Sequence, residues 1–247
     1  MSAGPGQAWT REQTLAALSL YCQIPFGKMH HRNASVIALA SRLGRTPSSV
    51  AFRLVNLASL DPEHHERGVR GMSNASAMDR QVWSDYYGRW DELAEAANTT
   101  GDELTESECF NVVTEAESTV KSRRGQAFFR RAVLSAYEGA CCVTGIHAGE
   151  LLRASHIVPW SQNHEHRLDP RNGIALNALH DACFDRGLLT FDQKLRLVVG
   201  RGLKDYVPNG VYDSFFGRFQ GEMMRLPLRF RPHDEFLDYH RTRIFEE

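Results

Sequence analysis

A single histidine ends an apolar run in the segment ASHIVPW, where His156 comes shortly before Pro159 and Trp160. A proline at that point predicts that a strand is ending, so the imidazole is expected at a strand end rather than inside a packed core. Imidazole has an ordinary pKa of about 6.5 and accepts a proton at neutral pH. His156 is therefore a candidate general base.

Two further polar residues follow at 16 and 24 positions after His156, namely Asn172 and His180. The segment LLRASHIVPW is expected to be a strand, HRLDPRNG a loop and IALNA a second short strand. The segment LHDACFDRGL has helical spacing, and FDQKLRLVV is expected to return as a strand. The pattern thus predicts strand, loop with Asn172, strand, and helix with His180.

This order closely resembles that of the HNH endonucleases, the ββα-metal nucleases, over about residues 128–200. The resemblance implies phosphodiester hydrolysis, with His156 deprotonating the attacking water and a divalent cation stabilising charge on the phosphorane and the leaving oxygen. It implies that Asn172 ties the loop together and helps to orient the base, and that His180 faces the same cleft as a metal ligand. Mg²⁺ or Mn²⁺ is expected, and Zn²⁺ or Ni²⁺ is compatible.

The sequence departs from the family pattern at two positions that concern the metal. Many HNH sequences carry an acidic residue directly before the catalytic histidine, where this chain has Ser155, and Phe184 stands where a second helical histidine is common. Asp185 is the expected additional oxygen ligand, with Asp181 or Asn177 less favoured, although Asp185 could instead close the helix end. Two CxxC units often bind structural zinc in this family; CCVTG lacks the second cysteine, so no structural zinc is expected.

Composition and charge divide the chain into three regions. Of its 247 residues, 42% are hydrophobic and 24% are charged, and no early apolar run suits a membrane span or a signal peptide, so a cytoplasmic protein is expected. Its five cysteines, two of them adjacent, fit reduced thiols rather than a disulfide framework. Net charges of +2, −7 and +4 predict a domain at 1–93, an acidic linker at 94–120 and a second domain at 121–247.

The first region is expected to be helical, with one helix in TREQTLAALSLYCQI capped by Thr10, and a second in ASVIALASRLG ended by Gly44. A third helix is expected to start at Ser48 or Ser49. This helix-turn-helix pattern, which loosely resembles Myb-like and homeodomain-like modules, would place the last helix in the major groove of DNA. The candidate DNA-contacting residues are Arg45, Ser48, Ser49, Arg53 and Asn56; the alternative is a helical bundle with solvated arginines.

A second set of candidate DNA contacts is the basic start of the third region, which suits a phosphate backbone. These residues are Lys121, Arg123, Arg124, Arg130 and Arg131. The predicted fold class is α+β, with an N-terminal helix-turn-helix-like domain and a C-terminal ββα-metal nuclease domain that uses one metal ion.

The expected function is cleavage of double-stranded DNA. The segments CCVTG, ASHIVPW and PRNGIALNALHDACFDRGL resemble the HNH branch of bacterial restriction endonucleases, including modification-dependent ones. One HNH site cuts one strand, so a double-strand break implies a homodimer. Two alternatives stay open: a DNA-binding regulator with a degenerate nuclease domain, and an RNA-directed or structure-specific nuclease.

Overall fold

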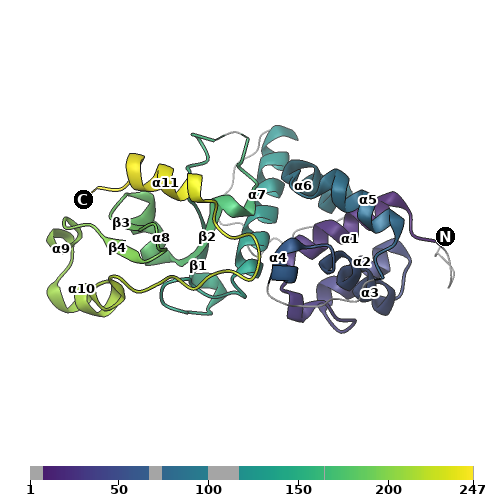
Figure 1. Cartoon of the computed structure of the whole chain (residues 1–247), viewed down its shortest axis with the longest axis horizontal. Helices are drawn as coiled ribbons and strands as arrows, with labels where there is room; N and C mark the ends of the chain where they lie inside the picture. The colour runs from purple at the N-terminus through teal and green to yellow at the C-terminus, as the bar shows by residue number, and fades with distance from the viewer. Residues whose placement is uncertain (1–7, 67–73, 100–116, 164, 247) are drawn as a thin grey trace. The chain divides into compact units, whose positions relative to one another are not determined.

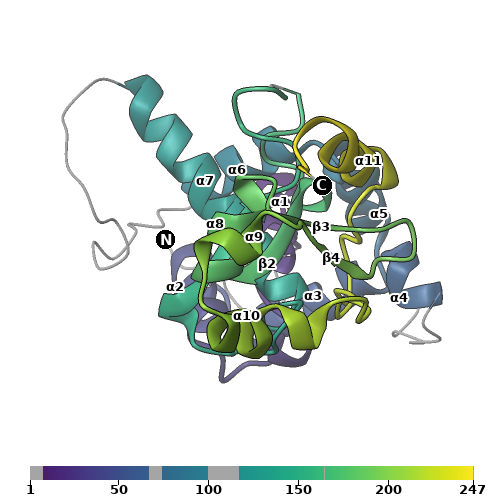
Figure 2. The ribbon, with the colours of Figure 1, turned by 90° about the vertical axis from the view of Figure 1, so that its left-hand side faces the viewer.

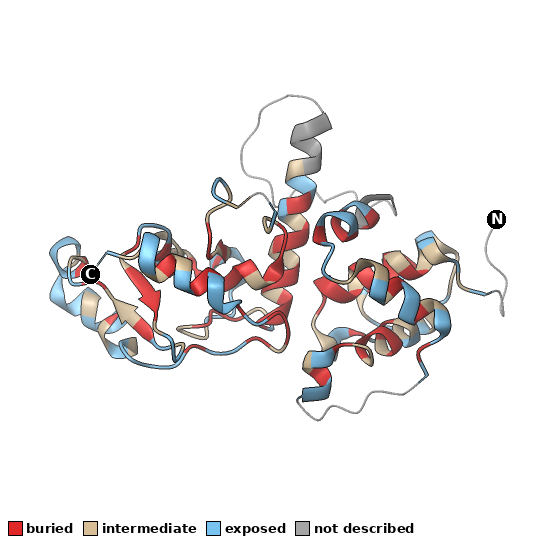
Figure 3. Cartoon of the chain, turned by 45° about the horizontal axis from the view of Figure 1, so that its top comes forward, coloured by how far each residue is buried: buried red, intermediate tan, exposed pale blue. Residues whose placement is uncertain are grey.

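The computed structural model describes residues 8–66, 74–99, 117–163 and 165–246, and it divides into two compact units, Met1–Ala132 and Val133–Glu247 (Figure 1). In each unit the buried residues lie on the sides of the helices that face their neighbours (Figure 3). The helix α7, Glu117–Ala136, runs across the division between the units.

The N-terminal unit is built around α1, Arg11–Gln23, which contacts four other helices. Its buried face includes Leu18, Tyr21 and Cys22. Thr10 caps α1 in a capping box with Gln13, so the helix starts where the sequence predicts. The other elements are η1 Phe26–Lys28, α2 Ala34–Leu43, α3 Pro47–Ala58, α4 Pro62–Glu66, α5 Ala77–Tyr86 and α6 Trp90–Thr99.

The pair α2 and α3 forms the expected helix-turn-helix arrangement. Gly44 ends α2 in the left-handed conformation, with φ of 63°, which glycine adopts without steric cost. The start of α3 differs from the prediction: it begins at Pro47, and the Thr46 side chain accepts the N–H of Ser49. A proline in the first turn loses no helical hydrogen bond, so the sequence TP sets the start instead of Ser48 or Ser49.

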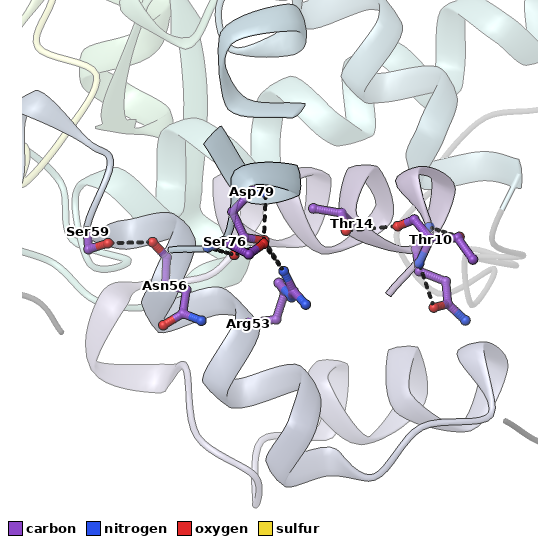
Figure 4. A network of polar contacts seen from close by, with 8 residues as sticks. Thr10, Thr14, Arg53, Asn56, Ser59, Ser76 and Asp79 are labelled. Atoms are coloured by element: carbon purple, nitrogen blue, oxygen red, sulfur yellow. Dashed lines mark hydrogen bonds and ion pairs between the residues drawn. The ribbon is translucent and has the colours of Figure 1, made fainter. Parts of the chain in front are cut away.

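The polar face of α3 makes contacts inside the unit, and the reading of DNA by Arg53 and Asn56 stays a prediction. Arg53 pairs with the fully buried Asp79 at the start of α5 (Figure 4). Its guanidinium lies 4.5 Å from the ring centre of Trp9. Asn56 is 4% exposed. A carboxylate as buried as Asp79 requires a cationic partner, and Arg53 is the residue that supplies it.

The predicted linker at 94–120 overlaps a helix at each end. Ala94 and Ala96 are buried within α6, which packs on α1, and α7 already begins at Glu117. Residues 100–116, which carry most of the acidic stretch, lie outside the described residues. The domain boundaries proposed from charge stay a prediction.

The C-terminal unit holds the expected strand, strand, helix order. The strands β1, Leu152–His156, and β2, Gly173–Asn177, pair antiparallel with His156 opposite Gly173, and α8, Ala178–Asp185, packs on both (Figure 2). Asn177 ends β2 and caps α8 by accepting the N–H groups of Leu179 and His180. Strand and helix therefore meet at one residue, which sets the helix against the hairpin.

The remaining elements enclose this motif. The segment FDQKLRLVV, expected to be one strand, instead starts at the last residue of β3, Leu189–Phe191, and turns into β4, Leu197–Val199, which pairs antiparallel with β3. The Asp192 side chain accepts the N–H groups of Lys194 and Arg196, which turns the chain between them. The other elements are η3 Gly149–Leu151, η4 Pro170–Asn172, α9 Leu203–Tyr206, α10 Asn209–Phe215, η5 Gly217–Phe219 and α11 Asp234–Arg243.

A buried histidine joins α11 to α8 and β3. His240 is 1% exposed and stacks on Phe184, with ring centres 3.6 Å apart. Its Nε2 contacts the Phe184 carbonyl oxygen at 3.0 Å, and its Nδ1 contacts the Thr190 hydroxyl at 2.9 Å. Because a carbonyl only accepts, Nε2 carries the hydrogen and Nδ1 accepts from Thr190. Burial lowers the pKa of His240 to about 4.

This histidine should make the fold less stable in mild acid. Between pH 6.5 and 4 the unfolded chain protonates His240 while the folded chain does not, so stability falls as pH falls through that window. We expect His240 to remove about 2 kcal/mol of unfolding free energy between pH 7 and pH 5. Urea unfolding at both pH values should show a smaller loss in His240→Gln, which keeps a donor for Phe184. The matched control His147→Gln, at an exposed histidine, should keep the wild-type loss; equal losses in all three proteins would contradict the assignment.

Candidate active site

The first candidate residue, His156, lies at the end of β1 as predicted. It is half-buried, and its Nε2 lies 3.0 Å from the carbonyl oxygen of Arg167. Since this oxygen only accepts, Nε2 carries the hydrogen and Nδ1 is the basic nitrogen of the ring. Burial lowers the pKa of His156 below its usual value, against a smaller opposing effect of the Arg167 carbonyl. The imidazole is therefore neutral at neutral pH, which is the protonation state that a general base requires.

Asn172 is fully buried and closes the loop between the two strands. Its Oδ1 accepts the N–H of Val158 at 2.8 Å, and its Nδ2 donates to the carbonyls of Val158 at 3.1 Å and His166 at 3.3 Å. Its own carbonyl accepts the N–H of Ile157 at 3.0 Å. The Asn172 side chain thus connects Val158, two residues after His156, to His166, the residue before Arg167. A role for this amide in catalysis stays a prediction.

His180 is directed into the core of its unit, and its expected role as a metal ligand stays a prediction. It is fully buried, with Nδ1 2.8 Å from Nδ2 of Asn177 and Nε2 2.7 Å from the carbonyl oxygen of Phe215. The edge of Phe216 covers the ring at 5.2 Å between ring centres. Both nitrogens already have protein partners, because Asn177 and the end of α10 meet on the inward side of α8. His180 joins α8 to α10.

Two carboxylates lie on another face of α8. Asp181 and Asp185 are one turn apart and interact electrostatically. Partial burial of its carboxyl group raises the pKa of Asp185 to about 6, and the charge of Asp181 adds to this rise. The Ser155 hydroxyl opposes it, so this hydroxyl lies near the Asp185 carboxylate. Ser155 is 3% exposed.

We call Ser155, Asp181 and Asp185 the oxygen cluster. Ser155 precedes His156 in the sequence, and Asp181 and Asp185 lie on α8, where Asp185 interacts with both other residues. Among the described residues, no group of three or more His, Cys, Asp or Glu side chains is arranged to hold a metal ion. The cluster has two carboxylates and one hydroxyl, which are hard donors of the kind that Mg²⁺ and Mn²⁺ prefer. The donor types of these three residues therefore suit a divalent cation of this kind.

The cysteines of the C-terminal unit lie in its core. Cys141, Cys142 and Cys183 are buried and have free thiols. The Cys142 N–H donates to the Ala175 carbonyl at 2.7 Å, and its carbonyl accepts the N–H of Arg225 at 2.8 Å. The CCVTG turn is thus attached to β2 by its backbone.

The candidate DNA contacts differ in how accessible they are. On α7, Arg123 and Arg124 are exposed, Arg130 and Arg131 are half-buried, and the Lys121 side chain lies outside the description. In the N-terminal unit, Ser48 is exposed and Ser49 is half-buried. Arg45 donates to the carbonyl of Ala8 at 2.7 Å and to Oε1 of Gln13 at 2.8 Å. It therefore fastens the N-terminal segment to α1.

Sequence reasoning did not single out two residues that lie beside His156. Trp160 and Arg167 both contact His156, and only the closed loop brings them there. The sequence favoured Asp185 over Asp181 as an oxygen ligand, and Ser155 was a departure from the family pattern. Asp181 and Asp185 are four residues apart in the expected helix, and this spacing is the sequence signal that predicts both carboxylates on one face.

Comparison with known proteins agrees with this geometry. A family model described as HNH endonuclease matches residues 141–192, which include β1, β2 and α8. No curated protein matches the chain. Among the described residues, no helix has the length and apolar character needed to span a membrane. The predicted fold class is confirmed, and the chain carries an HNH endonuclease domain at residues 141–192, preceded by a helical N-terminal region.

Proposed function

We propose that this protein is a metal-dependent endonuclease that hydrolyses phosphodiester bonds of double-stranded DNA. The observation that carries the proposal is the pairing of a neutral, oriented His156 with the oxygen cluster of Ser155, Asp181 and Asp185 in an HNH domain. A base and a cation site are the two components that phosphodiester hydrolysis requires. The proposal replaces His180 with Asp181 as the metal ligand that α8 contributes with Asp185.

The reaction assigns one proton transfer to this chain. Nδ1 of His156 accepts a proton from water as the water oxygen forms a bond to phosphorus, and the bond from phosphorus to the leaving 3′ oxygen breaks. The Arg167 carbonyl stabilises the imidazolium that results, because it accepts the hydrogen on Nε2. Ser155, Asp181 and Asp185 would hold a divalent cation, which would supply positive charge to balance the negative charge that develops on the phosphate and the leaving oxygen.

Removal of the base should abolish cleavage and spare binding. His156→Ala should lower the rate of plasmid nicking by at least about 100-fold, since a positioned general base contributes that much or more. Duplex binding and thermal stability should stay close to wild type, because the ring is half-buried rather than part of the core. Gel-based nicking assays and binding titrations measure the two effects. A folded His156→Ala protein with full activity would exclude this residue as the base.

Removal of the oxygen ligands should weaken the metal requirement specifically. Asp181→Asn and Asp185→Asn should each raise the Mn²⁺ or Mg²⁺ concentration needed for half-maximal cleavage by about tenfold or more, because an amide oxygen is a weaker ligand. Asp192→Asn, a carboxylate in the β3–β4 turn, is the control that should not change it. His180→Ala should lower the melting temperature instead, since this ring is buried between α8 and α10. The assignment fails if the two aspartate variants retain the wild-type metal titration.

The N-terminal unit supports a role in holding DNA, through residues other than those on the polar face of α3. Residues 13–60 contain five Lys and Arg residues and no Asp or Glu. Three of the five, Lys28, Arg32 and Arg42, are exposed, on η1 and on or near α2. An exposed cationic surface of this kind suits phosphate contacts that do not depend on base sequence.

Substitutions should show that Lys28 and Arg32 affect DNA binding, whereas Arg53 affects stability. The double variant Lys28→Glu, Arg32→Glu should weaken duplex binding and reduce the slope of log affinity against log salt by about two, one for each lost phosphate contact. Arg53→Ala should instead lower thermal stability, because it leaves Asp79 buried without its cation. Binding titrations at several salt concentrations and thermal melts of both proteins provide the measurements. Wild-type salt dependence in the double variant would remove η1 and α2 from the DNA contacts.

The proposal includes a more specific function, which is restriction of DNA with dependence on modified bases. Its support is the resemblance of CCVTG, ASHIVPW and PRNGIALNALHDACFDRGL to the restriction branch of the family. Double-strand breaks would further require two copies of the chain, because one site cuts one strand. Incubation with plasmids that carry different base modifications, with several divalent ions, tests this function. Parallel RNA and single-stranded substrates test the structure-specific alternative, and binding without cleavage under all conditions would favour the regulator.

A further inference from the structure

The loop between β1 and β2 returns to His156 through two residues that the proposed mechanism does not yet use. The ring of Trp160 meets the imidazole edge to face, with ring centres 5.6 Å apart and an interplanar angle of 85°. The guanidinium of Arg167 lies 5.1 Å from the centre of the Trp160 ring. Arg167 therefore contacts Trp160 with its side chain and His156 with its carbonyl.

A further hydrogen bond closes this arrangement. Nε of Arg167 donates to the carbonyl oxygen of Trp160 at 2.9 Å. The same loop is held at His166, whose carbonyl accepts Nδ2 of Asn172 and whose N–H donates to Oδ1 of Asn163 at 3.1 Å. His156, Trp160 and Arg167 thus form a closed set of three contacts, which we call the loop latch.

The loop latch constrains the imidazole in two ways that one hydrogen bond does not. The bond from Nε2 to the Arg167 carbonyl selects the tautomer, but it leaves the ring plane free to swing about that bond. The edge-to-face contact with Trp160 restricts the plane. The position of the carbonyl depends in turn on the Arg167 side chain, because its guanidinium and Nε both hold the loop to Trp160.

We propose that the side chains of Trp160 and Arg167 are positioning residues that hold His156 in the Nε2–H tautomer and in one ring orientation, with Nδ1 as the proton acceptor. The effect on catalysis rests on the proposed function, whereas the effect on the tautomer does not. Positioning of a general base acts on the chemical step, so its loss should lower kcat and leave substrate binding unchanged. Direct contact of the same side chains with DNA would instead raise KM.

The kinetic test compares variants that break the latch with variants that preserve parts of it. Trp160→Ala should lower kcat by about tenfold or more with KM within about twofold of wild type. Trp160→Phe keeps an aromatic ring beside the imidazole and should recover most of the rate. Arg167→Lys keeps the charge but loses the planar group and Nε, so it should lower kcat in the same direction. Arg153→Lys, on the exposed side of β1, is the control.

A spectroscopic test uses the protein without DNA or metal. Long-range proton–nitrogen correlation spectra of ¹⁵N-histidine-labelled protein report the tautomer of each ring, and the spectrum of His156→Ala identifies the signals of His156. Wild type should show the Nε2–H tautomer, and Trp160→Ala and Arg167→Lys should show a mixture of tautomers. Trp160→Phe should remain close to wild type. Thermal melts establish that each variant is folded, and Arg167→Lys and Trp160→Phe provide the comparison if Trp160→Ala does not fold.

The outcomes distinguish failure of the loop-latch proposal from failure of the proposed nuclease function. An unchanged His156 tautomer in both Trp160→Ala and Arg167→Lys overturns the proposal, as does an increase in KM without a fall in kcat. A mixed tautomer together with a lower kcat supports it. If wild type cleaves no substrate, the proposed function fails, and the spectra still decide whether Trp160 and Arg167 hold the ring.

Discussion

The buried amide of Asn172 is the constraint on which the candidate active site depends. A loop that starts at a buried hairpin leaves backbone groups that water cannot reach, and these groups require partners. The Asn172 amide pairs with the N–H and carbonyl of Val158 on one side of the loop and with the carbonyl of His166 on the other. The closed loop then places the Arg167 carbonyl at His156. The orientation of the candidate base is therefore a consequence of satisfying buried backbone groups several residues away.

The helix α8 divides its side chains between stability and chemistry. His180, Cys183 and Phe184 are buried and join the helix to the rest of its unit. Asp181 and Asp185 lie on a different face, where partial burial and mutual repulsion raise the pKa of Asp185. Repulsion between two carboxylates is a cost to the fold that a bound cation would reverse. The same short helix thus anchors the motif with one face and offers oxygen ligands with another.

The N-terminal unit uses its arginines in two ways. Arg53 compensates the buried charge of Asp79, and Arg45 fastens the N-terminal segment to α1, so neither side chain projects into solvent as a reading group would. Lys28, Arg32 and Arg42 are exposed. A helix-turn-helix arrangement therefore does not by itself identify which residues meet DNA, because the polar face of its last helix can be covered by a neighbouring helix.

The sequence by itself determined the order of strand, loop, strand and helix, the position of His156 at a strand end, and the caps at Thr10 and Gly44. These features depend on local conformational preferences and on spacing along the chain, and neither requires knowledge of the tertiary contacts. Only the tertiary structure decided the side of α8 on which His180 lies, because that depends on where α10 and Asn177 meet it. It likewise decided that Asp79 faces Arg53, and that Trp160 and Arg167 return to His156. Such contacts join residues distant in sequence, and their geometry is fixed by packing and by the need to pair buried polar groups.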